Sequence, residues 1–267
     1  MNRVYTCFPG GKLRCLTMSY DDGQIHDRRL VEIFNRHGIR GTFHLNSGRA
    51  ATEENHVRPQ EFPSLYRGHE VACHTVTHPT IERCPMPSVI SEVLQDRIAL
   101  ERAMGYPVRG LSYPNGSYSS EICDMLRHVG IRYSRVVGDS EDFSLPKDLM
   151  RWMPTCHHNH RLMELGNAFL NKSGRQHQYL MYVWGHSFEF DRQGNWPLIE
   201  DFCAMMAGRN DIWYATNIEI VDYLETFERL QFAADNSFVY NPSIASAWIS
   251  VNDGEPREIP GGSLVRL

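Results

Sequence analysis

Residues 17–23 read TMSYDDG, so that an apolar, strand-like run ends in two adjacent carboxylates and a glycine. The run begins at Leu13 and is interrupted only by Arg14. A single Asp at such a place could be an ordinary helix cap. Two neighbouring carboxylates repel each other unless a cation or a proton compensates them. The stretch therefore raises the hypothesis of a cation site at the end of a buried strand.

The composition fits one large globular unit. The chain has 267 residues, enough to bury roughly three quarters of the surface that the unfolded chain exposes. Lys plus Arg is 27 and Asp plus Glu is 32, which gives a net charge of −5. This mild acidity offers no electrostatic footprint for nucleic acid or an anionic membrane. We therefore expect neither as a partner, and the oligomeric state stays open.

Three features of the sequence bear on the location of the protein. No apolar run approaches the length of a membrane-spanning helix, and the N-terminus, MNRVYTCFPGG, lacks the apolar stretch of a signal peptide. The seven cysteines are an odd number without a C-x-x-C pair, which is typical of reduced thiols. These features predict a cytoplasmic protein. A secreted mature form whose leader has been removed is the alternative.

Strand-like and helix-like segments alternate along most of the chain, in about seven strand–helix units. Such alternation predicts an α/β fold with a mainly parallel sheet and helices packed outside it. The strand-like segments are 13–19, 41–45, 70–73, 109–113, 131–137, 179–184 and 211–215, and the helix-like segments are 28–37, 89–104, 121–129, 196–207 and 218–230.

The character of the sequence changes after residue 230. Residues 237–262 combine β-branched and aromatic residues with Asn-Pro, Asp-Gly and Gly-Gly pairs, which predicts a few antiparallel strands. We therefore divide the chain into an α/β unit, residues 1–230, and a short β-rich C-terminal extension, residues 231–267, packed on it. Residues 139–172 form the longest segment without a regular pattern, and segments of this kind are often functional.

Polar clusters follow four of the predicted strands at their C-terminal ends. They are Asp21 with Asp22, His74 with His78, residues 113–116 (YPNG), and His186. In βα barrels the catalytic residues collect on that face. The coincidence of four clusters favours a closed or nearly closed barrel with one active site over a doubly wound sheet.

These residue types suit a metal site. Two His separated by three residues share a face if their segment is helical, and a zinc-type site needs three protein ligands and an open position. One of the two Asp, with His74 and His78, supplies that set. Because a divalent cation lowers the pKa of bound water to about 7, the second Asp could accept the water proton. His186, from another strand, could be the general acid.

Each of these patterns also has a simpler interpretation. Asp-Asp-Gly alone is typical of a turn, and an isolated HxxxH pair of an exposed helix, but their joint occurrence at strand ends favours a metal site. The run CHHNH at residues 156–160 is a rival metal cluster, whose simplest interpretation is a polar loop that could line a substrate groove. Several large apolar residues are expected in the core or a groove wall rather than in a cofactor site: Trp152, Trp184, Trp196, Trp213, Met205 and Met206.

Residues 15–230 resemble the polysaccharide deacetylase family, the NodB-homology domain of carbohydrate esterase family 4. The family's first motif, Thr-Phe-Asp-Asp-Gly, resembles residues 19–23, and its second, His-Ser/Thr-x-x-His, is matched in full by residues 74–78. The resemblance implies a distorted (β/α)7 barrel and one divalent metal ion, zinc in the first place, with Co²⁺, Ni²⁺ or Mn²⁺ as alternatives. It implies the following roles: Asp21 as catalytic base, Asp22, His74 and His78 as metal ligands, and His186, in the late motif VWGH, as general acid.

Two family motifs are matched only in part. The third motif, Arg-x-Pro-Tyr-Gly, resembles residues 112–116, but Ser112 stands in place of the Arg, and we consider Arg109 as its substitute. By resemblance, the backbone N–H of Asn115 would help to bind the oxyanion. Further candidates for substrate binding are Tyr113, His157 and Trp184. The fourth motif, an Asp near a Trp, could be represented by Asp139, Asp142, Asp148 or Trp152, so the residue that tunes His186 stays open.

The sequence thus predicts a metal-dependent hydrolase that removes an acyl group, in the first place the N-acetyl group of a carbohydrate. An O-acetyl ester is equally compatible and chemically easier to cleave. Related amidohydrolases act on C–N bonds of small non-sugar molecules, so a small amide is a further alternative. A catalytically silent sugar-binding barrel is the rival from another class, and the presence of both Asp21 and His186 argues against it.

Overall fold

A parallel sheet of eight strands forms the centre of the computed structural model, which describes residues 1–267. The strand order is β6-β5-β4-β3-β2-β8-β7, with β9 paired to β2, and every pair is parallel. The bounds are β2 Arg14–Asp22, β3 Gly41–Leu45, β4 Glu70–Cys73, β5 Gly110–Ser112, β6 Tyr133–Arg135, β7 Cys156–His157, β8 Tyr179–His186 and β9 Ile212–Tyr214.

The sheet curves into a half-barrel whose two end strands are β6 and β7. An isolated bridge joins Arg135 of β6 to Trp152, which lies in the segment that leads to β7. The long central strand β2 is buried along nearly its whole length, as expected for a parallel strand that is covered on both faces. The half-barrel therefore has one shared end at which the carboxyl ends of the strands meet.

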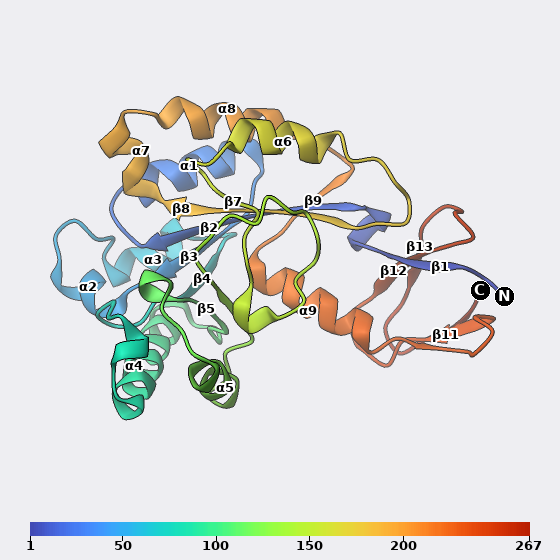
Figure 1. Ribbon diagram of the computed structural model, residues 1–267, viewed down its shortest axis with the longest axis horizontal. Coiled ribbons are helices and arrows are strands. Elements are labelled where there is room, and N and C mark those ends of the chain that lie inside the picture. The colour runs from blue at the N-terminus through green and yellow to red at the C-terminus, as the bar shows by residue number, and fades with distance from the viewer.

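Helices cover both sides of the sheet. Figure 1 shows α1, α6, α7 and α8 on one side of it and α4 and α5 on the other, while α9 runs from β9 toward the C-terminal strands. The bounds are α1 Asp27–His37, α2 Ser47–Thr52, α3 Phe62–Leu65, α4 Met86–Met104, α5 Ser120–His128, α6 Leu162–Leu170, α7 Ser187–Gln193, α8 Trp196–Met206 and α9 Asn217–Glu228. None of these helices is both long and apolar enough to cross a membrane.

Most predicted elements exist, with shifted ends. β3 and β4 have the predicted bounds, whereas β2 and β8 are longer, so that the Asp pair and His186 are the last residues of their strands rather than the residues that follow them. The expected irregular segment 139–172 is partly wrong, because it contains β7 and helix α6.

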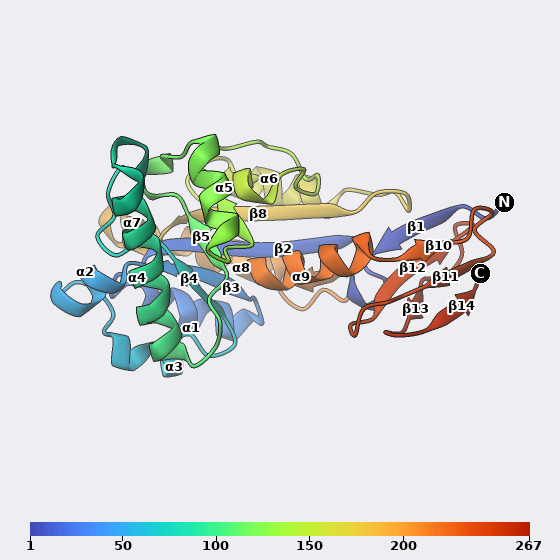
Figure 2. The ribbon, with the colours of Figure 1, turned by 90° about the horizontal axis from the view of Figure 1, so that it is seen from below.

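Residues 231–267 form short antiparallel strands, as predicted, and together with β1 they make two three-stranded sheets with the orders β1-β12-β13 and β10-β11-β14. Their bounds are β1 Val4–Cys7, β10 Gln231–Phe232, β11 Phe238–Tyr240, β12 Ala247–Val251, β13 Arg257–Ile259 and β14 Leu264–Arg266. Figure 2 shows both chain ends beside these strands. The division at residue 230 stays a prediction, and strand pairing places β1 with the C-terminal strands.

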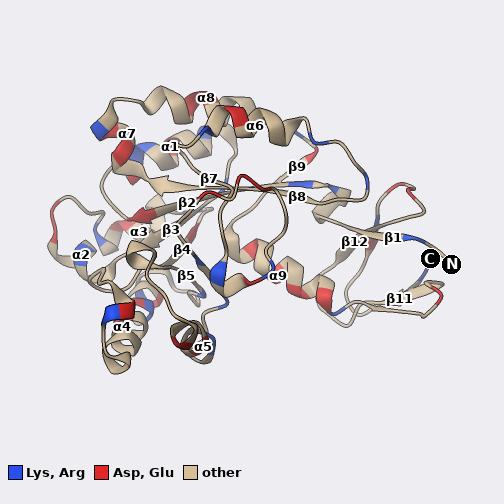
Figure 3. Ribbon diagram, in the orientation of Figure 1, with Lys and Arg blue, Asp and Glu red and all other residues tan.

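Salt bridges connect helix α9 to the N-terminal ends of three strands of the barrel. Its acidic residues, seen as red turns in Figure 3, meet arginines that immediately precede β3, β5 and β6. The pairs are Arg40 with Glu219, Arg109 with Asp222, and Arg132 with Glu225. This end of the barrel is opposite to the carboxyl ends of the strands.

Candidate active site

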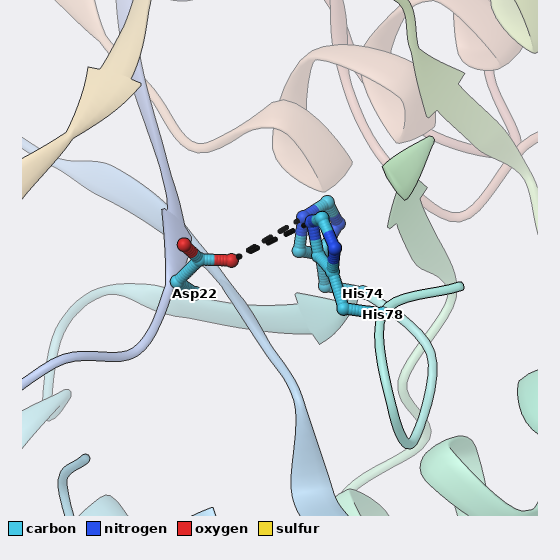
Figure 4. A group of neighbouring side chains, drawn as sticks. All are labelled: Asp22, His74 and His78. Atoms are coloured by element: carbon cyan, nitrogen blue, oxygen red, sulfur yellow. Dashed lines mark ion pairs between the residues drawn. The ribbon is translucent and has the colours of Figure 1, made fainter. Parts of the chain in front are cut away.

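Three of the predicted metal ligands meet at the carboxyl end of the sheet. Asp22 is the last residue of β2, His74 directly follows β4, and His78 lies four residues further on. Asp22 Oδ1 lies 3.7 Å from Nε2 of His74 and 3.7 Å from Nε2 of His78 (Figure 4). Asp22 and His74 are buried, and His78 is half-buried. The three ligand atoms are close enough to share one cation.

The segment that carries the two histidines is a loop, so the helical geometry considered for the HxxxH pair is wrong. Left-handed residues at Thr75, with φ 66°, and His78, with φ 62°, turn the chain back on itself. The backbone N–H of His78 donates to Thr75 Oγ1 over 3.1 Å and closes the turn. The two imidazole rings thereby come to 4.7 Å between centroids, although no helix aligns them.

The ligand set fits a divalent cation. Nδ1 of His74 faces the carbonyl oxygen of Ser112 at 2.8 Å and its hydroxyl at 2.7 Å. A hydrogen on Nδ1 that is shared with these oxygens leaves the Nε2 lone pair directed at the site. Asp22 Oδ1 is buried and has no hydrogen-bond partner, which is costly for a carboxylate oxygen unless a cation sits beside it. Two imidazole nitrogens and a carboxylate are an accepted zinc-type set.

Backbone strain gathers around the same place. Four of the nine non-glycine residues with positive φ belong to it, namely Asp22, Thr75, His78 and Asn115. Left-handed conformations are unfavourable for residues with a Cβ, and they persist where the surrounding structure enforces them, which is often at functional sites.

A cavity of about 360 Å³ opens beside the three ligands. It is lined by Asp21, Asp22, His74, His78, Tyr113, Asn115, Val137, Trp184 and His186. The structure therefore brings eight of the predicted site residues to one cavity. Arg109 and His157 do not line it.

Asp21 is held by donors from two other strands. Ser112 Oγ donates to Asp21 Oδ1 over 3.1 Å, and the guanidinium of Arg135 donates to Oδ2. Burial alone would raise the pKa of Asp21, but the charge of Arg135, with smaller contributions from nearby imidazoles, holds that pKa far below its usual range. Asp21 is therefore an ionised carboxylate with a fixed orientation.

The expected role of Arg109 is wrong. Both of its terminal nitrogens donate to the carboxylate of Asp222 on α9, at 2.7 and 2.8 Å, at the opposite end of β5. Arg109 precedes β5, whereas the site is built at the carboxyl ends of the strands. The cation that faces Asp21 comes instead from the last residue of β6, Arg135, which is fully buried and which the sequence analysis did not select.

His186 stands beside Asp21 on the neighbouring strand, because β2 and β8 pair with Asp21 opposite His186. Its Nδ1 lies 3.5 Å from Glu189 Oε1, one helical turn later in α7. Burial would lower the pKa of His186, but contact with Glu189 and the nearby charges of Asp21 and Asp22 raise it above its usual value. Glu189 is thus the carboxylate that faces His186.

The residues considered for the fourth motif have other contacts. Asp148 accepts from the backbone N–H of Met150 and pairs with Arg151. Asp142 accepts from the N–H groups of the two residues that follow it, and Asp139 accepts from the N–H of His157. Trp152 is buried against Tyr133 and Tyr182.

The substrate-binding candidates divide into two groups. Asn115 and Trp184 line the cavity, and the Arg135 guanidinium lies 4.5 Å from the centroid of the Trp184 ring. Tyr113 also lines the cavity, but its hydroxyl donates to the carbonyl of Met150 over 2.9 Å and is unavailable to a ligand. His157 packs against Trp184 and does not line this cavity, so its place in a substrate groove stays a prediction.

Comparison with known proteins shows a family similarity that includes part of this site. The family model described as polysaccharide deacetylase matches residues 10–134. Over these residues the chain is similar to polysaccharide deacetylases. The matched residues include Asp21, Asp22, His74 and His78, and they end one residue before Arg135.

The curated relatives match about half of this chain. The chitooligosaccharide deacetylase of Sinorhizobium fredii is 26% identical over 132 residues, which are 48% of this chain and 60% of that protein. The chain thus spans about 60% of the length of the curated relatives that it matches.

Solved structures show the fold over a longer stretch. A Mycobacterium smegmatis protein assigned to the polysaccharide deacetylases is 17% identical, with a TM-score of 0.65 over 84% of this chain and 94% of that one. The Xyl-CE4 domain of a multidomain xylanase from the hindgut metagenome of Trinervitermes trinervoides is 16% identical, with a TM-score of 0.54 over 80% of this chain and 92% of that one. The predicted distorted (β/α)7 barrel is confirmed.

Proposed function

We propose that the protein is a metal-dependent hydrolase that removes the acetyl group from an N-acetylated carbohydrate. The observation that carries the proposal is the grouping of residues in one cavity: the Asp22–His74–His78 set, an ionised carboxylate, Asp21, and an imidazole, His186, all line it. The family of the domain and the name of its Sinorhizobium fredii relative support a carbohydrate substrate.

Asp22, His74 and His78 would hold the cation, zinc in the first place. When bound there, a divalent cation polarises an acyl carbonyl and makes water acidic near neutral pH. Asp21 is the base that takes the proton of the attacking water. Asp21 must be ionised to accept this proton, and hydrogen bonds from Arg135 and Ser112 to its two oxygens stabilise the ionised form.

His186 returns a proton to the leaving amine. An amine is a poor leaving group unless it is protonated as the C–N bond breaks, so a general acid is needed in the cavity besides the base. The raised pKa of His186 favours its imidazolium form, which is the form that can donate. The backbone N–H of Asn115, in the left-handed turn at the cavity wall, is our candidate donor to the developing oxyanion.

Release of acetate from acetylated chito-oligomers by zinc-loaded protein tests this proposal. We expect turnover that a chelator abolishes and that zinc restores. Replacement of His186 by Ala should lower the rate on these amides by roughly 10²–10⁴-fold, with a smaller loss on p-nitrophenyl acetate, whose leaving group needs no proton. Equal losses on both substrates would show that His186 is not the general acid.

Parallel assays separate the alternatives. Acetate release from acetylated xylan but not from chito-oligomers would assign an O-acetyl esterase, and hydrolysis of small formamides or cyclic ureides alone would assign a non-sugar amidohydrolase. Binding of chito-oligomers without any turnover of the metal-loaded protein would overturn the proposal in favour of a silent sugar-binding barrel.

We also propose that the protein works in a reducing compartment such as the cytoplasm. All seven cysteines are free in the structure, and six of them are buried. Free buried thiols fit a compartment in which disulfides are not maintained. Fractionation of cells that express the full-length gene product would test this location.

A further inference from the structure

A second convergent cluster of ligand-type side chains lies behind the active site. His157 and His158 are adjacent in the chain at the end of β7, and Glu189 comes from the first turn of α7. Glu189 Oε2 lies 3.0 Å from Nε2 of His157 and 3.1 Å from Nε2 of His158. His158 is fully buried, and the other two are half-buried. Two imidazoles and one carboxylate therefore converge on a single place.

This cluster repeats the arrangement of the Asp22–His74–His78 site. In both, one carboxylate oxygen is buried without a hydrogen-bond partner, Asp22 Oδ1 in one and Glu189 Oε2 in the other, although two imidazole nitrogens are close to it. Nε2 of His158 is also buried without a hydrogen-bond partner despite its short distance to Glu189. The groups are near enough to pair, but their axes do not point at one another, as expected when they point at a common ligand between them.

The separations suit a small divalent cation. Zinc binds nitrogen and carboxylate oxygen at about 2.0–2.2 Å, so two ligand atoms at a tetrahedral angle lie roughly 3.3–3.5 Å apart. The second cluster has ligand separations of 3.0 and 3.1 Å, and the Asp22 set has 3.7 Å for both. The carboxylate–imidazole separations of both sets are within about 0.4 Å of the ideal spacing.

The ring of His158 is held in place for such a role. It stacks against Phe190 at 4.0 Å and 27° and against Tyr20 at 5.7 Å and 11°. A Cβ on residue 185 would lie 2.1 Å from its Nδ1, so only Gly185 leaves room for the ring. The backbone N–H of His158 donates to the carbonyl of Trp184 over 2.8 Å. A ligand fixed before binding loses little conformational freedom when the cation arrives.

One contact favours an alternative to metal binding, in which the three side chains are held together by hydrogen bonds. The backbone N–H of Asn159 donates to His157 Nδ1 over 3.1 Å, which places the ring hydrogen on Nε2. Cation binding through Nε2 requires this contact to open and the hydrogen to move to Nδ1. A metal-free cluster in which Nε2–H of His157 donates to Glu189 is therefore the competing outcome of the test.

We propose that His157, His158 and Glu189 form a second site for a divalent cation of the zinc class. The site reaches the catalytic cavity through one side chain, because the other oxygen of Glu189, Oε1, is the group that faces His186. Occupation of the second site would therefore fix the carboxylate beside the general acid. The proposal concerns metal binding alone and stands or falls independently of the acetyl-hydrolase activity.

Zinc stoichiometry of the folded protein tests the second site. Full-length protein is loaded with Zn²⁺, freed of excess metal by gel filtration and analysed for zinc. We expect two equivalents in the wild type and one in each of two variants, Glu189→Gln and His157→Ala. Glutamine keeps the shape of glutamate, but its neutral amide is a poorer ligand for a dication. His78→Ala should also retain one equivalent, and His78→Ala combined with Glu189→Gln should retain none.

His160→Ala is the matched control. His160 lies in the same turn, but its Nε2 faces Glu141 at 2.6 Å and not the cluster, so this variant should keep two equivalents. Circular dichroism must show that every variant is folded. One equivalent in the wild type that His78→Ala removes completely would overturn the proposal and identify the cluster as hydrogen-bonded side chains. Two equivalents in Glu189→Gln would overturn it as well.

Discussion

The orientation of Asp21 depends on Ser112 and Arg135, two residues of neighbouring strands that each donate to one of its oxygens. Ser112 also accepts from Nδ1 of His74, so one hydroxyl links the candidate base to a candidate metal ligand. A base whose two oxygens are both engaged presents the same lone pairs to every incoming water. The rate should therefore depend on residues that never touch the substrate.

Arg135 and Arg109 provide a matched pair of arginines for this argument. Arg135→Gln should lower kcat by roughly 10²–10³-fold, comparable to the loss of other preorganised charge donors. Arg109→Gln should leave kcat unchanged, because Arg109 pairs with Asp222 at the far end of the barrel. Steady-state kinetics on one acetylated oligomer would be measured for both. An inactive Arg109→Gln enzyme beside an active Arg135→Gln enzyme would reverse the assignment.

The two adjacent carboxylates can be separated by metal content. Asp22→Asn should weaken zinc binding, because an amide oxygen is a poorer ligand than a carboxylate. Asp21→Asn should keep the metal and lose the proton acceptor, at a cost of roughly 10²–10⁴-fold in rate. Zinc content and single-turnover rate would be compared in the two variants. Loss of zinc from Asp21→Asn alone would mean that the roles are exchanged.

The sequence predicted the residues of the two short motifs but not the residues that support them. Asp21, Asp22, His74 and His78 occur in compact patterns whose chemistry can be read locally. Arg135 cannot be found in this way, because its position beside Asp21 follows from the closing of β6 toward the other strands. Glu189 did leave a signal: it lies three residues after His186 at the start of a helix, a spacing that places two side chains on one face.

At the scale of elements, the loop between β4 and α4 brings the imidazoles of His74 and His78 together, which the sequence analysis had expected of a helix. Asn46 of the neighbouring β3–α2 connection donates from Nδ2 to the carbonyls of His74 and Thr75. Asp96 of α4 accepts from the backbone N–H of His74 over 3.0 Å. Buried side chains from two other segments thus hold the left-handed turn that aligns the imidazoles.

Asn46→Ala should therefore weaken metal binding without removing a ligand. Outer partners of metal ligands typically contribute 10- to 100-fold to affinity, and we expect a loss of roughly that size in zinc affinity, measured by competition with a chelator. Asn167→Ala on α6, where the amide donates only to the carbonyl of Met163, is the control. Unchanged zinc affinity in folded Asn46→Ala protein would show that the turn holds its shape without this side chain.

Helix α6 and the ends of strands β2 and β8 were not predicted, although the sequence contains a signal for the helix. The residues of α6, LMELGNAFL, place apolar side chains at Leu162, Leu165 and Phe169, spacings that fit a helix, and all three are buried. The polar run at residues 156–160, which precedes the helix, favoured the prediction of an irregular segment instead. The long strands β2 and β8 were predicted too short because their ends are polar, yet those ends are the site itself.

At the scale of the whole molecule, the C-terminal strands are joined to the barrel through α9 and β1. The hydroxyl of Tyr223 on α9 donates to the carbonyl of Cys7 over 2.7 Å and accepts from the N–H of Trp248 over 3.0 Å. One side chain thus connects the helix to the paired strands β1 and β12. Because β1 pairs with β12, the C-terminal extension shares a sheet with the first residues of the chain.

Buried carboxyl groups should shape the stability of the molecule as a function of pH. Glu70, at the start of β4, is buried and accepts from Tyr133 Oη, Thr42 Oγ1 and the backbone N–H of Ile218. Its burial raises its pKa from 4.5 to about 7, although these hydrogen bonds oppose the rise. In the folded state Glu70 therefore keeps its proton to higher pH than in the unfolded state.

This difference in the protonation of Glu70 determines whether the free energy of unfolding rises or falls with pH. Between pH 4.5 and about 7 the folded state binds more protons at Glu70 than the unfolded state, so the free energy of unfolding falls as the pH rises through that window. The upper bound on the loss is about 3 kcal/mol, at 1.36 kcal/mol for each pKa unit.

Glu70→Gln should remove this contribution, because its amide can keep the oxygen toward Thr42 and Ile218 and turn its NH₂ toward Tyr133. Urea unfolding of both proteins at pH 5 and pH 8 would be compared, and the wild type should lose more stability over that interval than Glu70→Gln. Equal losses in the two proteins would mean that Glu70 is ionised in the folded state at both values.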